Sequence, residues 1–280
     1  MNKAHAFFEL MRLDKPIGIY LLLWPALLAL IISTGGNFIY SDFLIVVIGS
    51  ILVRSAGCVI NDIWDKDLDG GVERTKLRPI PSKRVSIYES WALFLILGFL
   101  SLILLSLTNT NTIFISFCFS LLIILYPLTK RFLMGPQIFL GLTFNPTIIV
   151  YAMTDELNNS TMIFLYFAIA AMTIAFDTLY GLCDIEDDKK LGINSTPIWW
   201  GSNTLKIVAC FQSMAIFLLL IVGWQAALKF IWFLGVFFLI GFYLHQHHLA
   251  NQKKYFLAFK NNHWASFYLL MLSVLCFLII

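Results

Sequence analysis

Charged residues are scarce in this sequence. Asp, Glu, Lys and Arg together make up 12% of its 280 residues, whereas an ordinary soluble domain has about 25%. Apolar residues account for 60%, and the mean hydropathy is +0.84. This balance excludes an ordinary soluble domain and indicates a protein that lies in a lipid bilayer. No nucleic-acid partner is expected.

The sequence also lacks cysteines with the spacing of a metal site. Its five cysteines lie in or beside apolar segments, where packing in the protein interior is the expected role: Cys58, Cys118, Cys183, Cys210 and Cys276. No small-residue cleavage site follows the first apolar run, and the segment before that run is too short for an organelle transit peptide. These features favour a bacterial inner membrane.

Long apolar runs are abundant. Nine of them approach the roughly 20 residues that an α-helix needs to cross about 30 Å of hydrocarbon. Their approximate bounds are Ile17–Ser33, Phe43–Ile60, Ile87–Leu107, Ile113–Leu128, Pro136–Met153, Met162–Leu182, Leu205–Val222, Phe230–Leu244 and Trp264–Ile280. Hydrophobic residues cover every side of each run, which excludes the alternating polarity of a membrane β-barrel. The sequence therefore predicts an all-α integral membrane protein, a bundle of about nine transmembrane helices.

Basic residues indicate which helix ends face the cytoplasm, because Lys and Arg accumulate in cytoplasmic loops. Here they precede the first run and follow the even-numbered runs, whereas the odd-numbered loops hold only Lys229. The N-terminus is therefore predicted to be cytoplasmic and the C-terminus to lie on the opposite side. Residues 1–280 are predicted to form one transmembrane domain, with helices 1–4 and 5–8 as a pseudo-repeat and helix 9 added.

The first of two long acidic loops follows the second apolar run and reads NDIWDKDLDGGVERTKLRP. On a helix Asn61, Asp65 and Asp69 recur at i, i+4 and i+8, with Asp62 beside them. Stacked carboxylates repel one another, so this stripe favours a bound cation, and oxygen ligands select Mg²⁺ or Ca²⁺. An EF-hand calcium loop is disfavoured, because its twelfth position would be Lys76 in place of a bidentate Glu.

The second acidic loop follows the sixth apolar run and reads DTLYGLCDIEDDKKLGINST. Asp184 and Asp188 repeat the i, i+4 spacing, and Asp177 lies two turns earlier inside the apolar run. An ionisable side chain at that depth is costly and is expected to face a polar cavity or a partner. Both acidic loops lie at the same, cytoplasmic end of the predicted bundle, so they could share Mg²⁺ ions.

Basic residues near both loops complete the predicted site. Mg²⁺ prefers a few carboxylates together with phosphate oxygens, and basic side chains can neutralise a diphosphate leaving group. The candidates are Arg74, Lys76, Arg78, Lys130, Arg131, Lys189 and Lys190. The sequence therefore predicts a magnesium diphosphate between the two acidic loops.

These motifs resemble those of a known family. NDxxDxxxD followed by RTxxRP, and DTxY, DxxDD and GxxST in the second loop, look like the UbiA-type 4-hydroxybenzoate polyprenyltransferases. Further matches are MRLDKPIG and LLWPALLAL near the N-terminus, VRSAGCVIND before the first motif, and YPLTKR with PQIFLG after the fourth run. The resemblance covers nearly the whole chain.

The resemblance implies a reaction and a set of site residues. Mg²⁺ would assist ionisation of an allylic polyprenyl diphosphate, and the prenyl group would pass to the ring carbon ortho to the hydroxyl of 4-hydroxybenzoate, in ubiquinone synthesis. The expected metal ligands are Asn61, Asp65, Asp69, Asp184 and Asp188. Asp62 belongs to the same motif, and Tyr126 with Lys130 would lie against the diphosphate.

The chain departs from the family pattern in two places. Gly-x-Lys-Ser-Thr is usual after the second motif, but position 194 is Asn, so Lys189 or Lys190 is expected to supply the missing cation beside Ser195. After PQIFLG the chain has Asn145-Pro146, which is expected to kink the fifth helix and reshape the acceptor pocket.

The sequence does not decide which residues bind the aromatic acid and which residue takes its ring proton. The carboxylate of the aromatic acid calls for a guanidinium, which either Arg54 or Arg131 could supply. Asp62, Asp177 or Asp184 could take the ring proton or orient the hydroxyl. The rings of Tyr126 and Tyr180 are expected to stabilise the allylic cation.

Two other interpretations compete. A related prenyltransferase acting on another aromatic acceptor would keep the same diphosphate site. A cation-coupled secondary transporter would also carry paired motifs in two halves. It needs acids near the bilayer midplane, however, and only Asp177 lies well inside an apolar run. Prenyl transfer is therefore the favoured function.

Overall fold

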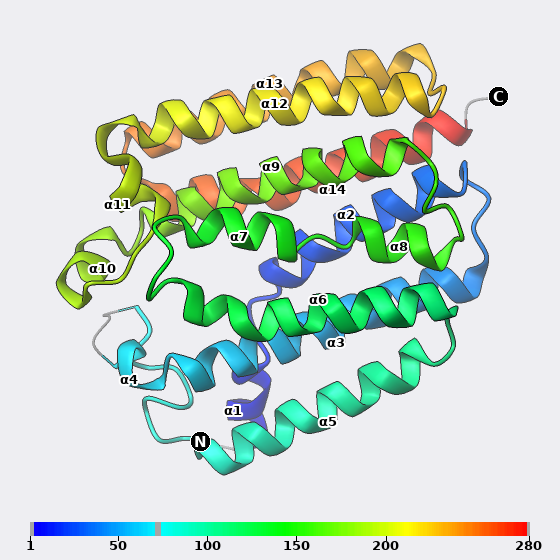
Figure 1. Ribbon diagram of the computed structural model, residues 1–280. Helices are drawn as coiled ribbons and strands as arrows, with labels where there is room; N and C mark the ends of the chain where they lie inside the picture. The colour runs from blue at the N-terminus through cyan, green and yellow to red at the C-terminus, as the bar shows by residue number, and fades with distance from the viewer. Residues whose placement is uncertain (1–2, 71–73, 279–280) are drawn as a thin grey trace.

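The computed structural model describes residues 3–70 and 74–278, and every regular element among them is a helix (Figure 1). The long helices are α2 (Ile17–Ser33), α3 (Tyr40–Trp64), α5 (Ile87–Leu105), α6 (Thr110–Thr129), α9 (Thr161–Gly181), α12 (Thr204–Gln225), α13 (Phe230–Asn251) and α14 (Tyr255–Leu278). The short ones are α1 (Lys3–Leu10), α4 (Lys66–Asp69), α7 (Pro136–Thr143), α8 (Thr147–Met153), α10 (Ile185–Leu191) and α11 (Thr196–Trp200), with a 3₁₀ turn at Gly201–Asn203. The predicted all-α fold is confirmed.

Within the described residues, six helical segments are long and apolar enough to cross a membrane: Tyr40–Trp64, Ile87–Leu105, Thr110–Thr129, Thr161–Gly181, Thr196–Gln225 and Phe230–Asn251. Helix α2 is apolar but shorter. Helix α14 begins well before the predicted Trp264, so Lys260 lies on a helix and not in the predicted loop. The chain is a multi-pass membrane protein, whereas nine crossings, the orientation and the pseudo-repeat stay predictions.

The run Pro136–Met153 was predicted to be one helix with a kink at Asn145-Pro146, and the structure goes further, because α7 and α8 are separate helices divided at residues 144–146. Pro146 has no N–H to donate to the carbonyl of Leu142. The hydroxyl of Tyr166 on α9 donates to that carbonyl instead, at 2.7 Å. Asn145 is buried, and its amide donates to the Tyr166 carbonyl at 2.8 Å. Hydrogen bonds to α9 therefore stabilise the interruption.

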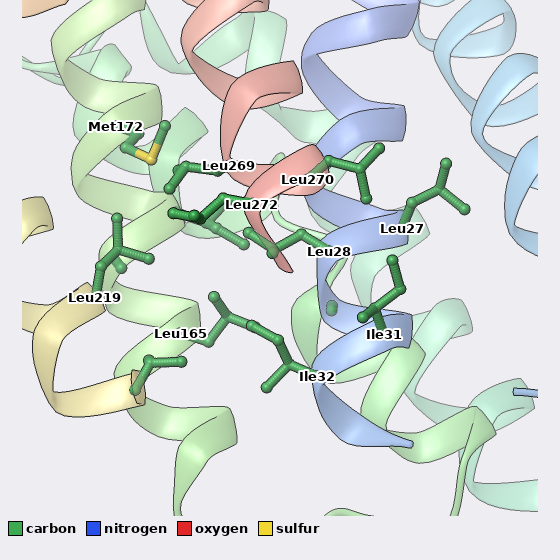
Figure 2. Close-up of a cluster of buried hydrophobic side chains, with 14 of the residues drawn as sticks. Leu27, Leu28, Ile31, Ile32, Leu165, Met172, Leu219, Leu269, Leu270 and Leu272 are labelled. Carbon is green, nitrogen blue, oxygen red and sulfur yellow. The ribbon is translucent and has the colours of Figure 1, made fainter. Parts of the chain in front are cut away.

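The largest hydrophobic core lies where α2, α9, α12 and α14 meet. Figure 2 shows leucine and isoleucine side chains of these four helices converging on one another. Ala168 and Ala171 on α9 are fully buried, and such small side chains let neighbouring membrane helices approach closely. Helices α5 and α6 expose most of their apolar side chains, as lipid-facing helices do.

The ends of α3, α6 and α9 lie at the same end of the bundle, together with α4, α10 and α11 (Figure 1). The backbone N–H of Asn194, in the segment after α10, donates to the Lys130 carbonyl at the end of α6 at 3.0 Å. Helix α1 packs against α3 near this end. The fold thus brings both acidic segments to one place, as the sequence predicted.

Candidate active site

The first acidic segment keeps a helical spacing across the junction of α3 and α4. The Asp65 N–H donates to the Asn61 carbonyl at 2.9 Å, and the Asp69 N–H donates to the Asp65 carbonyl at 2.8 Å. The side-chain amide of Asn61 also donates to Asp65 Oδ2 at 3.2 Å. The predicted repeat at i, i+4 and i+8 is therefore present in the structure.

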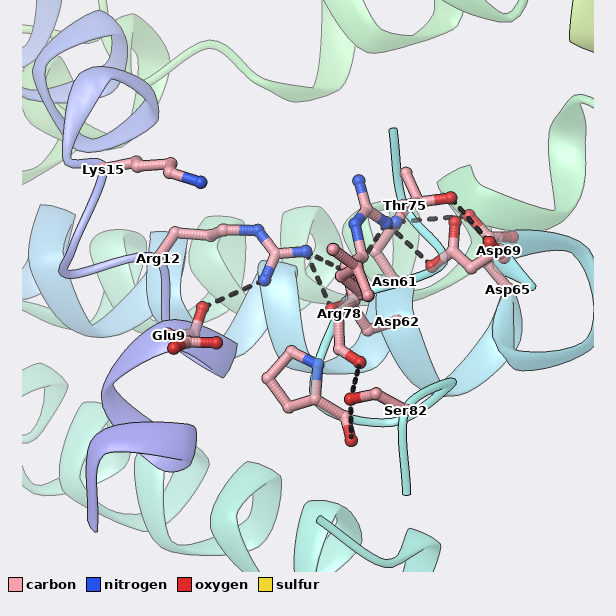
Figure 3. Close-up of polar contacts among 12 residues, drawn as sticks. Glu9, Arg12, Lys15, Asn61, Asp62, Asp65, Asp69, Thr75, Arg78 and Ser82 are labelled. Atoms are coloured by element: carbon pink, nitrogen blue, oxygen red, sulfur yellow. Dashed lines mark hydrogen bonds and ion pairs between the residues drawn. The ribbon is translucent and has the colours of Figure 1, made fainter. Parts of the chain in front are cut away.

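Asp62 is the centre of a buried ion network (Figure 3). Arg12 Nη2 donates to both of its carboxylate oxygens, at 2.8 and 2.7 Å. Arg78 Nη1 lies 3.1 Å from Asp62 Oδ1 and 2.8 Å from Asp69 Oδ2. Asp62 and Arg78 thus hold the segment together. Arg12 was not predicted to belong to the site, although it lies in the MRLDKPIG motif.

Asp65 faces the end of α6. Lys130 Nζ donates to Asp65 Oδ2 at 2.5 Å. Burial raises the pKa of the Asp65 carboxyl, and the nearby Lys130 ammonium offsets part of that rise. The other oxygen, Asp65 Oδ1, is buried and has no hydrogen-bond partner in the described part of the chain. An unpartnered buried carboxylate oxygen is the kind of donor that a hard cation binds.

Arg74, which follows α4 in sequence, reaches across to the second acidic segment. Its Nε and Nη2 donate to the two carboxylate oxygens of Asp184, at 2.9 and 2.5 Å. Its Nη1 donates to the hydroxyl of Tyr180 at 2.5 Å, and the guanidinium lies 4.8 Å from the centroid of that ring. The two acidic segments are therefore joined directly, side chain to side chain.

Asp188 completes this end of the site. Its backbone N–H donates to the Asp184 carbonyl at 2.8 Å, as the predicted i, i+4 spacing requires. Burial and the Asp184 carboxylate raise the pKa of Asp188 to about 6, with Lys130 and Arg74 acting in the opposite direction. Asp188 thus lies within electrostatic reach of the cations that pair with Asp65 and Asp184.

Deeper in the bundle, Tyr126 on α6 lies among the charged residues of both halves. Its side chain interacts electrostatically with Asp65, Asp177, Arg54 and Tyr180. Asp177 and Arg54 also interact with each other. A polar interior therefore extends from the paired carboxylates at the end of the bundle toward the middle of α3 and α9.

Arg54 is the arginine without a hydrogen bond or ion pair among the described residues. Each of the other arginines in the chain donates at least one hydrogen bond: Arg12, Arg74, Arg78, Arg84 and Arg131. Arg54 instead places its guanidinium 5.1 Å from the centroid of the Phe144 ring. Asp177 likewise has no hydrogen bond or ion pair within the described residues. Both groups are half-buried and their opposite charges attract each other, but neither would break a hydrogen bond or ion pair among the described residues in order to bind a polar ligand.

Three predicted site residues form no hydrogen bond or ion pair with the carboxylates of Asp62, Asp65, Asp69, Asp184 or Asp188 among the described residues. Arg131 is exposed, and its Nη2 donates to the Trp64 carbonyl at 3.1 Å. Lys190 is exposed and lies 3.6 Å from Asp187 in an ion pair. Ser195 is buried, and its hydroxyl has no hydrogen-bond partner among the described residues. Their predicted roles in substrate binding stay predictions.

The described residues contain no group of three or more Asp, Glu, His or Cys side chains close enough to hold a metal ion as they lie. The carboxylates that were predicted to bind Mg²⁺ are paired with Lys130, Arg74 and Arg78. The ligand types nevertheless fit Mg²⁺, because Asn61, Asp65 and Asp188 offer oxygens, and Asp65 Oδ1 is buried without a hydrogen-bond partner in the part of the chain that the structure describes.

An apolar cavity of about 660 Å³ lies between α2 and α14. Aromatic pairs occur both near the charged site and at the cavity: the ring centroids of Tyr180 and Phe259 are 4.6 Å apart, and those of Phe267 and Trp24, which line the cavity, are 5.2 Å apart. Residues that line the cavity include Trp24, Leu27, Ile31, Phe267, Leu270 and Phe277. The charged site therefore has an apolar cavity in the same bundle. Neither this cavity nor the role of Phe259 beside Tyr180 was predicted from the sequence.

Comparison with known proteins matches this architecture to one family. The model of the UbiA prenyltransferase family matches residues 22–270. The chain is 41% identical to a 4-hydroxybenzoate octaprenyltransferase of Psychromonas ingrahamii, over 95% of this chain and 94% of that protein. It is 40% identical to the protein of the same name from Stutzerimonas stutzeri, over 94% of this chain and 90% of that protein.

Solved structures show the same fold. A UbiA homologue from Aeropyrum pernix superposes with a TM-score of 0.79 at 22% identity, covering 90% of this chain and 94% of that one. A UbiA homologue from Archaeoglobus fulgidus bound to GPP and Mg²⁺ superposes with a TM-score of 0.71 at 16% identity, covering 94% and 99%. The fold, the full-length relatives and the matching family model lead to one conclusion: the chain belongs to the UbiA prenyltransferase family.

Proposed function

We propose that this chain transfers a polyprenyl group from polyprenyl diphosphate to the ring carbon ortho to the hydroxyl of 4-hydroxybenzoate, and releases diphosphate. One observation carries the proposal. A cluster of cations and carboxylates, built by Lys130, Arg74 and Asp65, lies at one end of the bundle. Arg54, which has no hydrogen bond or ion pair among the described residues, lies on the same face of α3 as Asp65, nearer the middle of the helix. The full-length relatives named as 4-hydroxybenzoate octaprenyltransferases support the same reaction.

The cluster at the bundle end suits a diphosphate. We infer that Asn61, Asp65, Asp184 and Asp188 would hold Mg²⁺, while Asp69 stays bound to Arg78. Bound Mg²⁺ would supply positive charge against the diphosphate as its negative charge grows. Arg74 and the side chain of Lys130 can exchange a carboxylate for phosphate oxygens, which gives the leaving group charge-assisted hydrogen bonds.

The interior of the bundle suits an aromatic acid. Arg54 and Asp65 are separated by 65 − 54 = 11 residues, which places them on nearly the same face of α3 and about 16 Å apart along its axis. A guanidinium without a partner favours a carboxylate, which it can bind through two parallel hydrogen bonds. Arg131 is a weaker candidate, because it is exposed and donates to the Trp64 carbonyl. We assign the acceptor carboxylate to Arg54.

The reaction follows from these positions. The bond between the first prenyl carbon and the diphosphate oxygen breaks, and the bonding electrons leave with the diphosphate. The rings of Tyr126 and Tyr180 stabilise the allylic cation. The ring carbon ortho to the hydroxyl attacks this cation and forms the new carbon–carbon bond. Asp177 takes the displaced ring proton, because Asp62 is engaged by Arg12 and Arg78 and Asp184 would hold Mg²⁺.

The hydrocarbon tail of the substrate needs an apolar site of its own. The cavity between α2 and α14 offers one, and six membrane-capable helices among the described residues place the protein in a bilayer. We infer that the membrane is the inner membrane of a bacterium. The basic loops favour a cytoplasmic position for the N-terminus and both acidic segments.

The test is transfer of radiolabelled polyprenyl diphosphate to 4-hydroxybenzoate in membranes that contain this chain. Prenylated product is expected with Mg²⁺, and no product after removal of divalent metal by a chelator until Mg²⁺ is restored. Membranes with the Asp65→Asn variant, inserted at the same level, are expected to be inactive. If product forms only with a different aromatic acid, the chain is still a prenyltransferase, but 4-hydroxybenzoate is not its acceptor.

A further inference from the structure

The guanidinium of Arg54 lies against a glycine of another helix. Gly18 is near the start of α2. A Cβ atom built on Gly18 would lie 2.5 Å from Arg54 Nε, 2.7 Å from Nη2 and 3.0 Å from Cζ. Real side chains do not approach this closely, so any residue larger than glycine at position 18 would displace the guanidinium.

Space is the reason for glycine at this position. Its backbone is helical and does not have the positive φ that favours glycine elsewhere in the chain, for example at Gly192 with φ +65°. Alanine is the better helix former, so a helix alone would favour alanine at position 18. The Arg54 side chain is flexible, and it would move before the backbone of α2 would.

A second contact comes from the interruption between α7 and α8. Phe144 ends α7, and its ring centroid lies 5.1 Å from Arg54 Cζ. Asn145 holds this interruption to α9 through its hydrogen bond to the Tyr166 carbonyl. A cation over an aromatic ring is attracted to it, and the ring has no hydrogen-bond acceptor that would compete for the guanidinium N–H groups.

We propose that Gly18 and Phe144 are positioning residues for Arg54. Gly18 provides the space that the guanidinium occupies, and Phe144 supports it without using its hydrogen-bond donors. Together they set where the carboxylate of the aromatic acid binds and therefore how tightly it is held. The inference rests on the proposed function, in which Arg54 receives that carboxylate.

The experiment compares steady-state kinetics of the full-length protein with Gly18→Ala and Gly57→Ala variants in membranes or detergent. Gly57 is a matched control on α3, because a Cβ there would have its nearest neighbour at an ordinary 3.8 Å, on Ile123. Gly18→Ala is expected to raise the KM for 4-hydroxybenzoate roughly ten-fold, as expected for a misplaced charged hydrogen bond. The KM for polyprenyl diphosphate and the melting temperature should stay near those of Gly57→Ala.

A double-mutant cycle separates positioning from general packing. Adding Gly18→Ala to an Arg54→Lys variant should raise the KM for 4-hydroxybenzoate much less than it does in the wild-type background. At the ring contact, Phe144→Leu should raise the same KM, and Phe144→Tyr should restore most of the affinity.

Four results would decide against this inference. A Gly18→Ala variant with the acceptor KM of the wild type would overturn it, and so would an equal rise in the KM values of both substrates. If Gly18→Ala raised the KM for 4-hydroxybenzoate as much in the Arg54→Lys variant as in the wild type, Gly18 would act through packing alone. If the wild-type chain does not prenylate 4-hydroxybenzoate at all, the proposed function fails and the inference fails with it.

Discussion

Arg74 and Asp184 are 110 positions apart in the sequence, and two hydrogen bonds between them join the two acidic segments of the site. The Arg74 side chain is about one-third exposed, so it can turn toward a ligand without unfolding its surroundings. This pair therefore holds the segments together, and in the proposed function it would also keep a guanidinium beside the diphosphate.

Replacing Arg74 tests whether its guanidinium lies beside the diphosphate. Arg74→Ala is expected to lower kcat/KM for polyprenyl diphosphate roughly 100-fold, because the leaving group loses a charged donor. Arg74→Lys should retain part of the activity, since it keeps the charge and loses the fork of donors. Steady-state kinetics at saturating 4-hydroxybenzoate would measure both variants. An Arg74→Ala enzyme with normal kcat/KM would contradict the assignment.

Asp62 is expected to matter for stability more than for chemistry. Asp62→Ala would leave the Arg12 and Arg78 guanidinium groups without their shared partner, and removal of one member of a buried pair costs about 3 kcal/mol or more. Thermal unfolding of the detergent-solubilised protein would show a lower melting temperature. Asp67→Asn, at an exposed position on α4, is the control and should unfold like the wild type.

Asp177 is expected to act after the prenyl cation forms. Asp177→Asn should lower kcat about 100-fold, as loss of a general base does, and should leave the KM for polyprenyl diphosphate nearly unchanged. With 4-hydroxybenzoate deuterated ortho to the hydroxyl, the variant should show a larger isotope effect than the wild type, because proton removal becomes limiting. An unchanged isotope effect would indicate that a group other than Asp177 removes the ring proton.

The apolar cavity makes a prediction about substrate length. Met271 lines it and is partly exposed, so Met271→Trp should fold and reduce its volume. The variant is expected to retain transfer from short prenyl diphosphates and to lose about ten-fold in kcat/KM with long ones, because each unburied CH₂ group costs about 0.8 kcal/mol. Met271→Leu is the matched control. Equal losses with short and long substrates would exclude the cavity as the tail site.

Much of the fold could be predicted from the sequence, because a bilayer leaves few choices. The runs beginning at Ile17 and Ile87 start where α2 and α5 start. The predicted i, i+4 spacing of Asp65 and Asp69 is present although α3 ends and α4 begins at this point, a junction that the sequence pattern did not predict. Backbone hydrogen bonds continue across the junction and keep the helical spacing. Helix ends in polar segments were less accurate, and α14 begins at Tyr255, well before its apolar run.

Long-range partners could not be predicted in the same way. Arg12 lies 50 positions before Asp62, and only the packing of α1 against α3 brings them together. The choice between Arg54 and Arg131 also needed the structure, because both are basic residues near acidic motifs in sequence. What separates them is that Arg131 donates to the Trp64 carbonyl and Arg54 has no hydrogen-bond partner among the described residues.

The interruption between α7 and α8 has an evolutionary consequence. The Tyr166 hydroxyl donates to a carbonyl that needs it only because residue 146 is proline and has no N–H. A lineage that replaced Pro146 with another residue would regain a backbone N–H that can donate to the Leu142 carbonyl. The hydrogen bond from the hydroxyl at position 166 would then no longer be needed. Positions 146 and 166 should therefore covary among relatives, with phenylalanine tolerated at 166 wherever proline is absent from 146.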